Sequence, residues 1–246
     1  MDLKGKGVVL TGATRGIGRE TLRLLIGEGS RVVAVGRDEG ALREIKREYG
    51  DAVFPIQADL SDPRQRERVV GMAAEVLGGL NVLINNAGFG IHGPSLEVPE
   101  ERMRELMEVN FWAPIHLTRL SVPFLRGGGV VLNVVSMIAF VPLQRWAIYS
   151  ASKSALRSFF MAVREELREE GVKVINVYPP VTRTDFFRSA GSEGIRGTGS
   201  VSPEKVAKTI VGALKRGKEE VFVSFWDGPL AKLGFLAGPV AVRLIK

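Results

Sequence analysis

Short apolar runs rich in valine and isoleucine alternate with amphipathic stretches along most of the chain. Seven runs have the length of strands, at 7–10, 31–35, 52–56, 82–84, 130–135, 172–177 and 221–225. Between them, apolar residues recur at helical spacing over 17–28, 39–49, 63–77, 100–125, 146–170 and 203–216. Apolar strands that alternate with helices are typical of a parallel sheet covered on both faces. The pattern therefore predicts an α/β fold, doubly wound, with a parallel sheet of about seven strands.

No proline- or serine-rich linker and no repeat divides the 246 residues into separate units. We therefore expect a single Rossmann domain over 1–227, followed by an apolar C-terminal tail over 228–246 that belongs to the same domain. The segment 184–200 holds four glycines and three serines, and we expect a mobile loop there.

The apolar tail leaves three interpretations open. Its apolar part, 230–245, is short for a bilayer-spanning helix and contains Lys232, Pro239 and Arg243. A flap over a pocket or a subunit contact is favoured, because apolar patches more often mark grooves or protein contacts. An interfacial membrane anchor stays open but is not favoured, although a basic protein suits an anionic lipid surface.

Charge and composition narrow the classes of partner. The formal net charge is +7, yet the signs alternate within stretches such as 43–50 and 164–171, as on solvated helix faces. No basic run is interleaved with aromatic residues, which argues against nucleic acid. The chain has no cysteine, so disulfides and thiolate ligands are excluded, and we expect no metal site. No apolar leader precedes a cleavage site, and we expect a cytoplasmic protein.

A glycine-rich turn joins the first predicted strand to the first predicted helix. Gly12, Gly16 and Gly18 stand in the stretch TGATRGIG. Glycines permit a positive φ and a close approach of the backbone to a ligand, and a helix N-terminus attracts a pyrophosphate. The spacing differs from the GxGxxG fingerprint of dinucleotide sites, and the turn could also be a turn only.

The end of the second predicted strand indicates the type of dinucleotide. A site for NADH often carries an acid there, which binds the ribose 2′-hydroxyl, but here Gly36 and Arg37 follow the strand. Arg37, together with Arg15 from the glycine turn, suits a 2′-phosphate. Asp38 lies one position further on, where we expect it to start the next helix. The residues therefore favour NADPH over NADH, although two solvated arginines would also explain them.

Tyr149 and Lys153 are spaced four residues apart in YSASK, which places them on one face of a helix. A free phenol has a pKa near 10. A cation about 4 Å away, at an effective dielectric constant near 20, would contribute roughly 4 kcal/mol, or about 3 pKa units. The pair therefore indicates a phenol tuned for proton transfer. The alternative is a pair on an exposed helix face.

An ordered set of motifs runs through the chain: TGATRGIG at 11–18, Asp59 in ADLSD, NNAG at 85–88, Asn110 in VNFWAP, Ser136 in NVVSMIAF, and YSASK at 149–153. Each motif alone is weak, but all six in this order are highly specific. By this set the chain resembles the short-chain dehydrogenase/reductase (SDR) family, as a ketoreductase-type member, over nearly its whole length.

The resemblance implies a catalytic role for four residues. Tyr149 would be the general acid that protonates a carbonyl oxygen as hydride reaches its carbon, and Ser136 would donate a hydrogen bond to that oxygen. Lys153 would lower the pKa of Tyr149 and hold the ribose of the nicotinamide. Asn110 would hold a water that links Lys153 to solvent.

The resemblance also implies the residues that bind the cofactor. They come from the glycine turn, from the ends of the strands and from the segment after the sixth strand: Gly12, Thr14, Arg15, Gly16, Ile17, Gly18, Arg37, Asp59, Leu60, Asn86, Ala87, Gly88, Tyr149, Lys153, Pro179, Val181 and Thr184. One position departs from the family, because Pro180 stands where a glycine is usual and removes an N–H.

The residues expected around the substrate are mostly apolar: Phe89, Ile91, His92, Met137, Trp146 and Phe186. They predict a bulky apolar carbonyl compound held with little polar specificity. His92 is one of two histidines in the chain. We favour the interpretation that it is a loop residue without a catalytic task.

The leading hypothesis is an NADPH-dependent reductase of ketones or aldehydes, or of acyl thioesters as one choice of substrate. A non-catalytic NADPH-binding sensor or scaffold is an alternative of a different class. A membrane-associated, lipid-modifying reductase is a second alternative. The family resemblance also implies a homodimer or homotetramer built on the helices predicted at 100–125 and 146–170.

Overall fold

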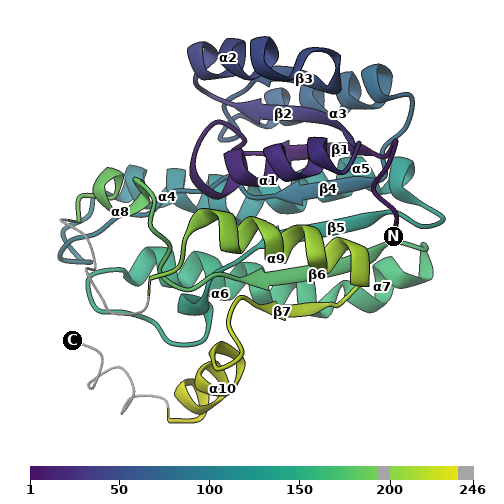
Figure 1. Ribbon diagram of the computed structural model, residues 1–246. Coiled ribbons are helices and arrows are strands. Elements are labelled where there is room, and N and C mark those ends of the chain that lie inside the picture. The colour runs from purple at the N-terminus through teal and green to yellow at the C-terminus, as the bar shows by residue number, and fades with distance from the viewer. Residues whose placement is uncertain (193–199, 238–246) are drawn as a thin grey trace.

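Seven strands form one parallel sheet in the computed structural model, which describes residues 1–192 and 200–237 (Figure 1). The strands follow the order β3-β2-β1-β4-β5-β6-β7. Their bounds are β1 Gly7–Thr11, β2 Arg31–Gly36, β3 Val53–Gln57, β4 Val82–Asn85, β5 Val130–Val134, β6 Lys173–Tyr178 and β7 Glu220–Phe222. The predicted parallel, doubly wound sheet is confirmed.

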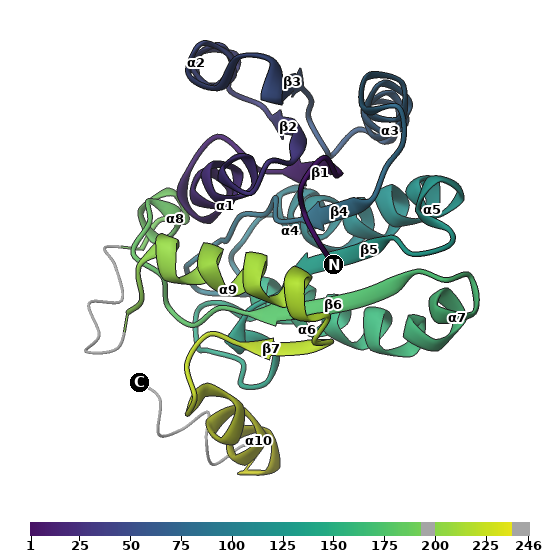
Figure 2. The same ribbon diagram turned by 45° about the vertical axis from the view of Figure 1, so that its right-hand side comes forward.

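Helices cover both faces of the sheet, because alternate residues of each strand point to opposite sides (Figure 2). One face packs on α1 (Gly16–Gly27), α2 (Glu39–Tyr49) and α9 (Pro203–Arg216). The other packs on α3 (Pro63–Leu77), α5 (Ala113–Leu125) and α6 (Ala147–Ala162). In β1, Val8 and Leu10 face the first set and Val9 the second. Both faces are therefore buried, which explains why the strands are apolar throughout.

A polar ladder crosses four neighbouring strands of the sheet. Asn85, Asn133, Asn176 and Glu220 are paired in register on four neighbouring strands. The Asn85 amide donates to Asn133 (2.9 Å), the Asn133 amide to Asn176 (3.0 Å), and the Asn176 amide to Glu220 (3.3 Å). A one-residue slip would break this ladder, so it specifies the register from which the site residues emerge.

The helix predicted over 100–125 is interrupted. It consists of α4 (Glu100–Met107), a π-helical turn η2 (Glu108–Trp112) and α5. The N–H of Ala113 donates to the carbonyl of Glu108, five residues back. Pro114 has no N–H to offer the Asn110 carbonyl, four residues before it, which favours this irregularity. π-Turns inside helices are frequent at functional sites.

Other differences from the predicted elements are small. The helix predicted over 146–170 divides into α6 and α7 (Arg164–Glu169), and β7 is shorter than predicted. Short 3₁₀ turns occur at η1 (Gly50–Ala52) and η3 (Met137–Ala139). In the loop predicted at 184–200, residues Phe186–Ser189 form a short helix, α8, and 193–199 lie outside the described residues.

The first part of the predicted tail is helical. α10 spans Asp227–Ala237, and residues 238–246 lie outside the described part of the chain. Figures 1 and 2 both show α10 beyond β7, apart from the two helical layers. Among the helices within 1–192 and 200–237, none is long and apolar enough to cross a membrane.

Candidate active site

A cavity of about 1200 Å³ opens at the carboxyl ends of the strands. Ligands bind at this edge in open α/β sheets. The volume exceeds the roughly 300–1,000 Å³ of an ordinary ligand pocket, so it has room for an extended molecule and a second, smaller one. All the predicted catalytic, cofactor and substrate residues line the cavity except Asn110, Ile91 and His92.

The glycine turn adopts the conformation that its sequence predicts. Gly12 and Gly16 have φ values of 66° and 55°, in the left-handed region that favours glycine. A Cβ at Gly18 would lie 1.9 Å from the Gly12 carbonyl oxygen, so only glycine permits this closeness of turn and helix. Arg15, the residue before α1, makes no side-chain capping hydrogen bond, and the first N–H groups of α1 are left for a ligand. The turn fits a pyrophosphate.

The far end of the cavity is built around Gly36 and Asp59. A Cβ at Gly36 would lie 2.6 Å from Thr14 Cγ2, which leaves no room for a larger residue. Burial disfavours the charged form of Asp59. The N–H and the hydroxyl of Ser61 donate hydrogen bonds to its carboxylate, and the charges of Arg37 and Arg66 attract it. Together these interactions outweigh the effect of burial and hold the pKa of Asp59 below its usual value. Asp59 is therefore an ionised acceptor at this end.

Asp38 has a structural task at the start of α2 and also lines the cavity. Its side chain accepts the N–H of Ala41 at 3.0 Å and caps α2, as expected from the sequence. Arg15 and Arg37 line the same part of the cavity. The cavity therefore has two guanidinium groups of the kind that binds phosphate, alongside the carboxylates of Asp38 and Asp59.

Arg66 is a site residue that the sequence reasoning missed. It is 2% exposed, and it donates to the carbonyls of Leu60 (2.7 Å) and Ser61 (3.1 Å) and to the carboxylate of Glu108 (2.5 Å). It thereby joins the Asp59 loop to the π-turn. The sequence did contain a signal for its burial, because Arg66 lies four residues before Val70 and therefore on the same, buried face of α3.

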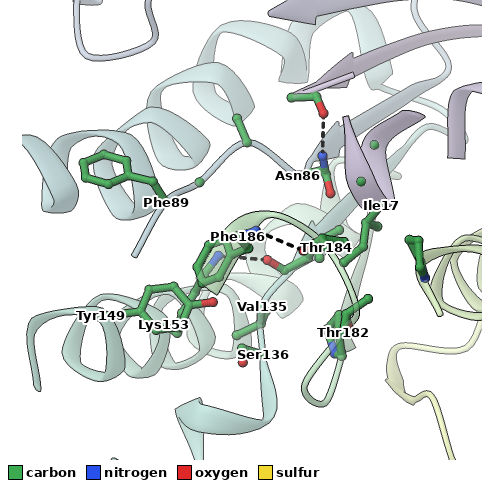
Figure 3. A pocket seen from close by; sticks show the side chains of 18 of the residues that line it. Ile17, Asn86, Phe89, Val135, Ser136, Tyr149, Lys153, Thr182, Thr184 and Phe186 are labelled. Carbon is green, nitrogen blue, oxygen red and sulfur yellow. Dashed lines mark hydrogen bonds between the residues drawn. The ribbon is translucent and has the colours of Figure 1, made fainter. Parts of the chain in front are cut away.

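Tyr149 and Lys153 project from α6 into the cavity, one turn apart, and Ser136 reaches them from the end of β5 (Figure 3). The Lys153 ammonium donates to the Val134 carbonyl at 3.0 Å and lies 6.0 Å from the centre of the Tyr149 ring. Lys153 is buried. The structure therefore brings these three predicted catalytic groups together, and the alternative of an exposed surface pair is wrong.

Burial shifts these two groups in opposite directions. It raises the pKa of Tyr149 to about 12, although a hydrogen bond with Ser136 acts to lower it. It lowers the pKa of Lys153 to about 8. The expected net lowering of the Tyr149 pKa is therefore not met in this structure. The reason is that desolvation dominates, while the ammonium is directed to the Val134 carbonyl.

Asn110 lies in the π-turn, fully buried and behind the cavity wall. Its amide donates to the Phe89 carbonyl (2.9 Å) and the Ser152 hydroxyl (3.2 Å), and its oxygen accepts the Phe89 N–H (3.0 Å). A Cβ at Gly88 would lie 3.0 Å from the Asn110 oxygen and 3.6 Å from the Lys153 nitrogen. The Asn110 side chain thus positions the loop that follows NNAG, and its water-holding role stays a prediction.

The segment after β6 reaches the glycine turn despite Pro180. A Cβ at Gly16 would lie 3.1 Å from Thr184 Cγ2, and Pro180 itself lines the cavity. The Pro179 carbonyl accepts the N–H of Met137 at 3.0 Å, which joins this segment to the strand end that carries Ser136. The chain therefore closes the cavity there without the usual glycine.

The substrate side of the cavity is aromatic. Trp146 stacks on Phe186 with an interplanar angle of 12°, and the Tyr149 and Phe186 rings are 5.3 Å apart. A Cβ at Gly90 would lie 2.7 Å from Trp146, so the loop after β4 is pressed against this cluster. Further apolar residues line the cavity: Ile138, Val141, Leu143, Phe187, Leu230 and Leu233. Of these, the sequence reasoning did not anticipate Val141 and Leu143.

Two predicted substrate residues lie elsewhere. His92 and Ile91 do not line the cavity. The His92 ring lies 5.2 Å from the Trp146 ring. The backbone N–H of His92 donates to the Ala190 carbonyl. His92 therefore supports the aromatic wall from behind, because its backbone is tied to the end of α8. Within 1–192 and 200–237, no group of three or more potential metal ligands is clustered.

Comparison with known proteins places these features in a family. Residues 6–194 match a family model described as short chain dehydrogenase. The chain is 34% identical over 226 residues to an uncharacterized oxidoreductase, DltE, of Bacillus subtilis, covering 90% of this chain and 89% of the relative.

Two solved structures share the architecture. A short chain dehydrogenase from Burkholderia cenocepacia in complex with NADP is 30% identical, with a TM-score of 0.85 and all of both chains covered. A short chain dehydrogenase/reductase from Burkholderia phymatum in complex with NAD has a TM-score of 0.87 and covers 96% of this chain and 95% of its own. At 22% identity that likeness concerns the fold alone.

Proposed function

The chain belongs to the short chain dehydrogenases, NAD(P)-dependent oxidoreductases that act on CH–OH groups, and from this premise we propose that it is an NADPH-dependent carbonyl reductase. The observation that carries the proposal is the meeting of Ser136, Tyr149 and Lys153 in one cavity with the glycine turn. The substrate is a ketone or aldehyde with a bulky apolar body, since aromatic and aliphatic side chains line that side of the cavity.

The two guanidinium groups of the cavity support the choice of NADPH. Arg15 and Arg37 would hold the 2′-phosphate, and the Asp38 carboxylate is engaged in capping α2. Gly12, Gly16 and Gly18 would bind the pyrophosphate through the turn and the N-terminus of α1, and Asp59 would accept from the adenine amino group. The bound cofactor supplies a hydride to the carbonyl carbon.

Tyr149 would deliver the proton that completes the alcohol. With a pKa of about 12 its hydroxyl is protonated at neutral pH, so it can donate to the carbonyl oxygen as negative charge develops there. Ser136, hydrogen-bonded to Tyr149, would donate to the same oxygen. Lys153 would stabilise the tyrosinate that remains, and its charge is present below a pKa of about 8. The products are the alcohol and NADP⁺, and Tyr149 is reprotonated from solvent.

The test is NADPH oxidation over a panel of aldehydes, ketones and quinones, with wild type and Tyr149→Phe compared and NADH as the control cofactor. We expect turnover that prefers NADPH and falls by about 10²–10⁴-fold in the variant, because the general acid is lost. Equal rates in the two proteins would refute the role of Tyr149. Tight NADPH binding without turnover on any compound would favour the sensor or scaffold.

We also propose that the protein works in the cytoplasm as a homodimer or homotetramer. Large apolar side chains are exposed on the helices from which that contact was predicted: Trp112 in the π-turn, Phe124 on α5 and Met161 on α6. Light scattering on the purified protein gives the subunit number, and replacing Phe124 by serine should weaken the association.

A further inference from the structure

The apolar wall of the cavity continues onto α10. Leu230, Ala231, Leu233 and Gly234 line the cavity together with the residues around Tyr149. Ala231 is buried, and a Cβ at Gly234 would lie 2.3 Å from Val141 Cγ2, so the helix packs directly on the loop that follows Ser136. α10 is therefore part of the mouth of the active site.

The rest of this segment is apolar and exposed. We call the set Phe225, Trp226, Leu230, Leu233, Phe235 and Leu236 the apolar ridge. Each of these residues is at least 60% exposed, and Phe225 reaches 84%. Within the described residues, the other exposed large apolar side chains lie on other elements: Met72, Leu96, Trp112, Phe124 and Met161. A cluster of this kind on a folded protein marks an interaction surface.

The position of the ridge restricts what can cover it. Leu230 and Leu233 belong both to the ridge and to the cavity lining, so whatever covers the ridge also adjoins the route into the active site. A second copy of the chain placed there would lie against the mouth of the cavity. A lipid surface would instead supply apolar substrates to it.

The chemistry of the ridge and its surroundings fits an anionic lipid surface. Phe225 and Trp226 are aromatic side chains of the kind that sits at a membrane–water interface. Beside them, the Lys205 ammonium donates to the Ser224 hydroxyl at 3.2 Å and lies next to the ridge. The chain as a whole carries a formal charge of +7, which attracts anionic headgroups.

We propose that the apolar ridge seats the protein on an anionic lipid surface, and that the cavity takes from this surface a carbonyl compound with a long apolar chain. The second part rests on the proposed reductase function, whereas the first part does not. No spanning segment is needed, because shallow burial of a few aromatic and leucine side chains is sufficient for interfacial binding.

The first experiment is flotation of the full-length protein with vesicles of phosphatidylcholine, alone or mixed with phosphatidylglycerol. Wild type should float with the mixed vesicles and more weakly with the neutral ones. The triple variant Phe225→Ser/Trp226→Ser/Leu236→Ser should lose at least about tenfold in partitioning, because three large apolar groups no longer enter the interface. Leu96→Ser is the matched control, since Leu96 is fully exposed at a distant site and should not matter.

The second experiment compares a long-chain aldehyde carried in the same vesicles with a short, water-soluble aldehyde. The triple variant should lose rate on the former and keep its rate on the latter. NADPH binding, followed by its fluorescence, checks that the variant is folded.

Wild type that floats with neither vesicle, or a triple variant that floats like wild type, overturns the proposal. So does a variant whose only defect is loss of an oligomer in light scattering, because the ridge would then be a subunit contact. Flotation without any turnover would fault the reductase function instead.

Discussion

At the scale of single residues, burial shifts the pKa values of Tyr149 and Lys153 in opposite directions, because it disfavours the phenolate of one and the ammonium of the other. A buried phenol loses the solvation of its anion, so its pKa rises to about 12 and it keeps its proton. A buried ammonium loses the solvation of its cation, so its pKa falls to about 8. The acid is therefore ready at neutral pH, and the group that titrates near neutrality is the lysine.

This difference predicts the pH dependence of the reaction. Reduction needs charged Lys153, which is present below a pKa of about 8 and lost as the pH rises through it. We expect kcat/KM for NADPH-dependent reduction to be flat from about pH 6 and to fall above about pH 8. Lys153→Arg keeps the charge at all these values, so any activity it retains should lack the falling limb. A profile that instead falls on the acid side would contradict the assignment.

At the scale of the elements, Arg66 connects two parts of the cofactor site that are distant in sequence. Its guanidinium, buried on α3, donates to the loop that carries Asp59 and to Glu108 in the π-turn. The π-turn in turn holds Phe89 through Asn110. The loop after β3 and the loop after β4 therefore share one support.

Replacing Arg66 by methionine should disturb cofactor binding from a distance. We expect the Kd for NADPH to rise about tenfold, because the Leu60 and Ser61 carbonyls lose the donor that orients the loop. Buried acceptors left unpaired cost about 1–3 kcal/mol each, so the free energy of unfolding should also fall.

Arg64→Met, at an exposed position of the same helix, is the control. Unchanged NADPH affinity together with lower stability would make Arg66 structural only. Fluorescence titration and urea unfolding supply the two measurements.

At the scale of the whole molecule, the cofactor cavity joins elements from most of the chain. Its lining runs from Gly12 after β1 to Gly234 on α10. A ligand that touches so many elements stabilises the folded state as a unit, by RT ln(1 + [L]/Kd). The preference for NADPH or NADH can therefore be measured as a shift in Tm, even while the substrate is unknown.

NADPH at about 100 times its Kd should add about 2.7 kcal/mol to the free energy of unfolding, and the same concentration of NADH should add less. Arg37→Ser should reduce the advantage of NADPH, since a cation that would bind the 2′-phosphate is removed, and should leave the effect of NADH nearly unchanged. Thermal melting with each cofactor measures both effects. A larger shift with NADH than with NADPH in wild type would refute the role given to Arg15 and Arg37.

From the sequence alone it was possible to predict the sheet, the order of helices and strands, the conformation of the glycine turn and most of the residues that line the cavity. These features depend on local periods and on short motifs, which are complete within a few consecutive residues. Asp38 capping α2 and glycine at position 18 are examples, because each needs only its near neighbours along the chain.

Features that depend on residues from distant parts of the chain could not be predicted from the sequence and became visible in the folded protein. The direction of the Tyr149 pKa shift, the buried bonds of Arg66, the placement of His92 behind Trp146 and the position of α10 at the cavity mouth are of this kind. Desolvation and hydrogen-bond partners are properties of a packed neighbourhood, and no local pattern specifies that neighbourhood. The π-turn could be predicted only in part. Pro114 is visible in the sequence, but its effect on the hydrogen bonding around Asn110 is seen only in the folded helix.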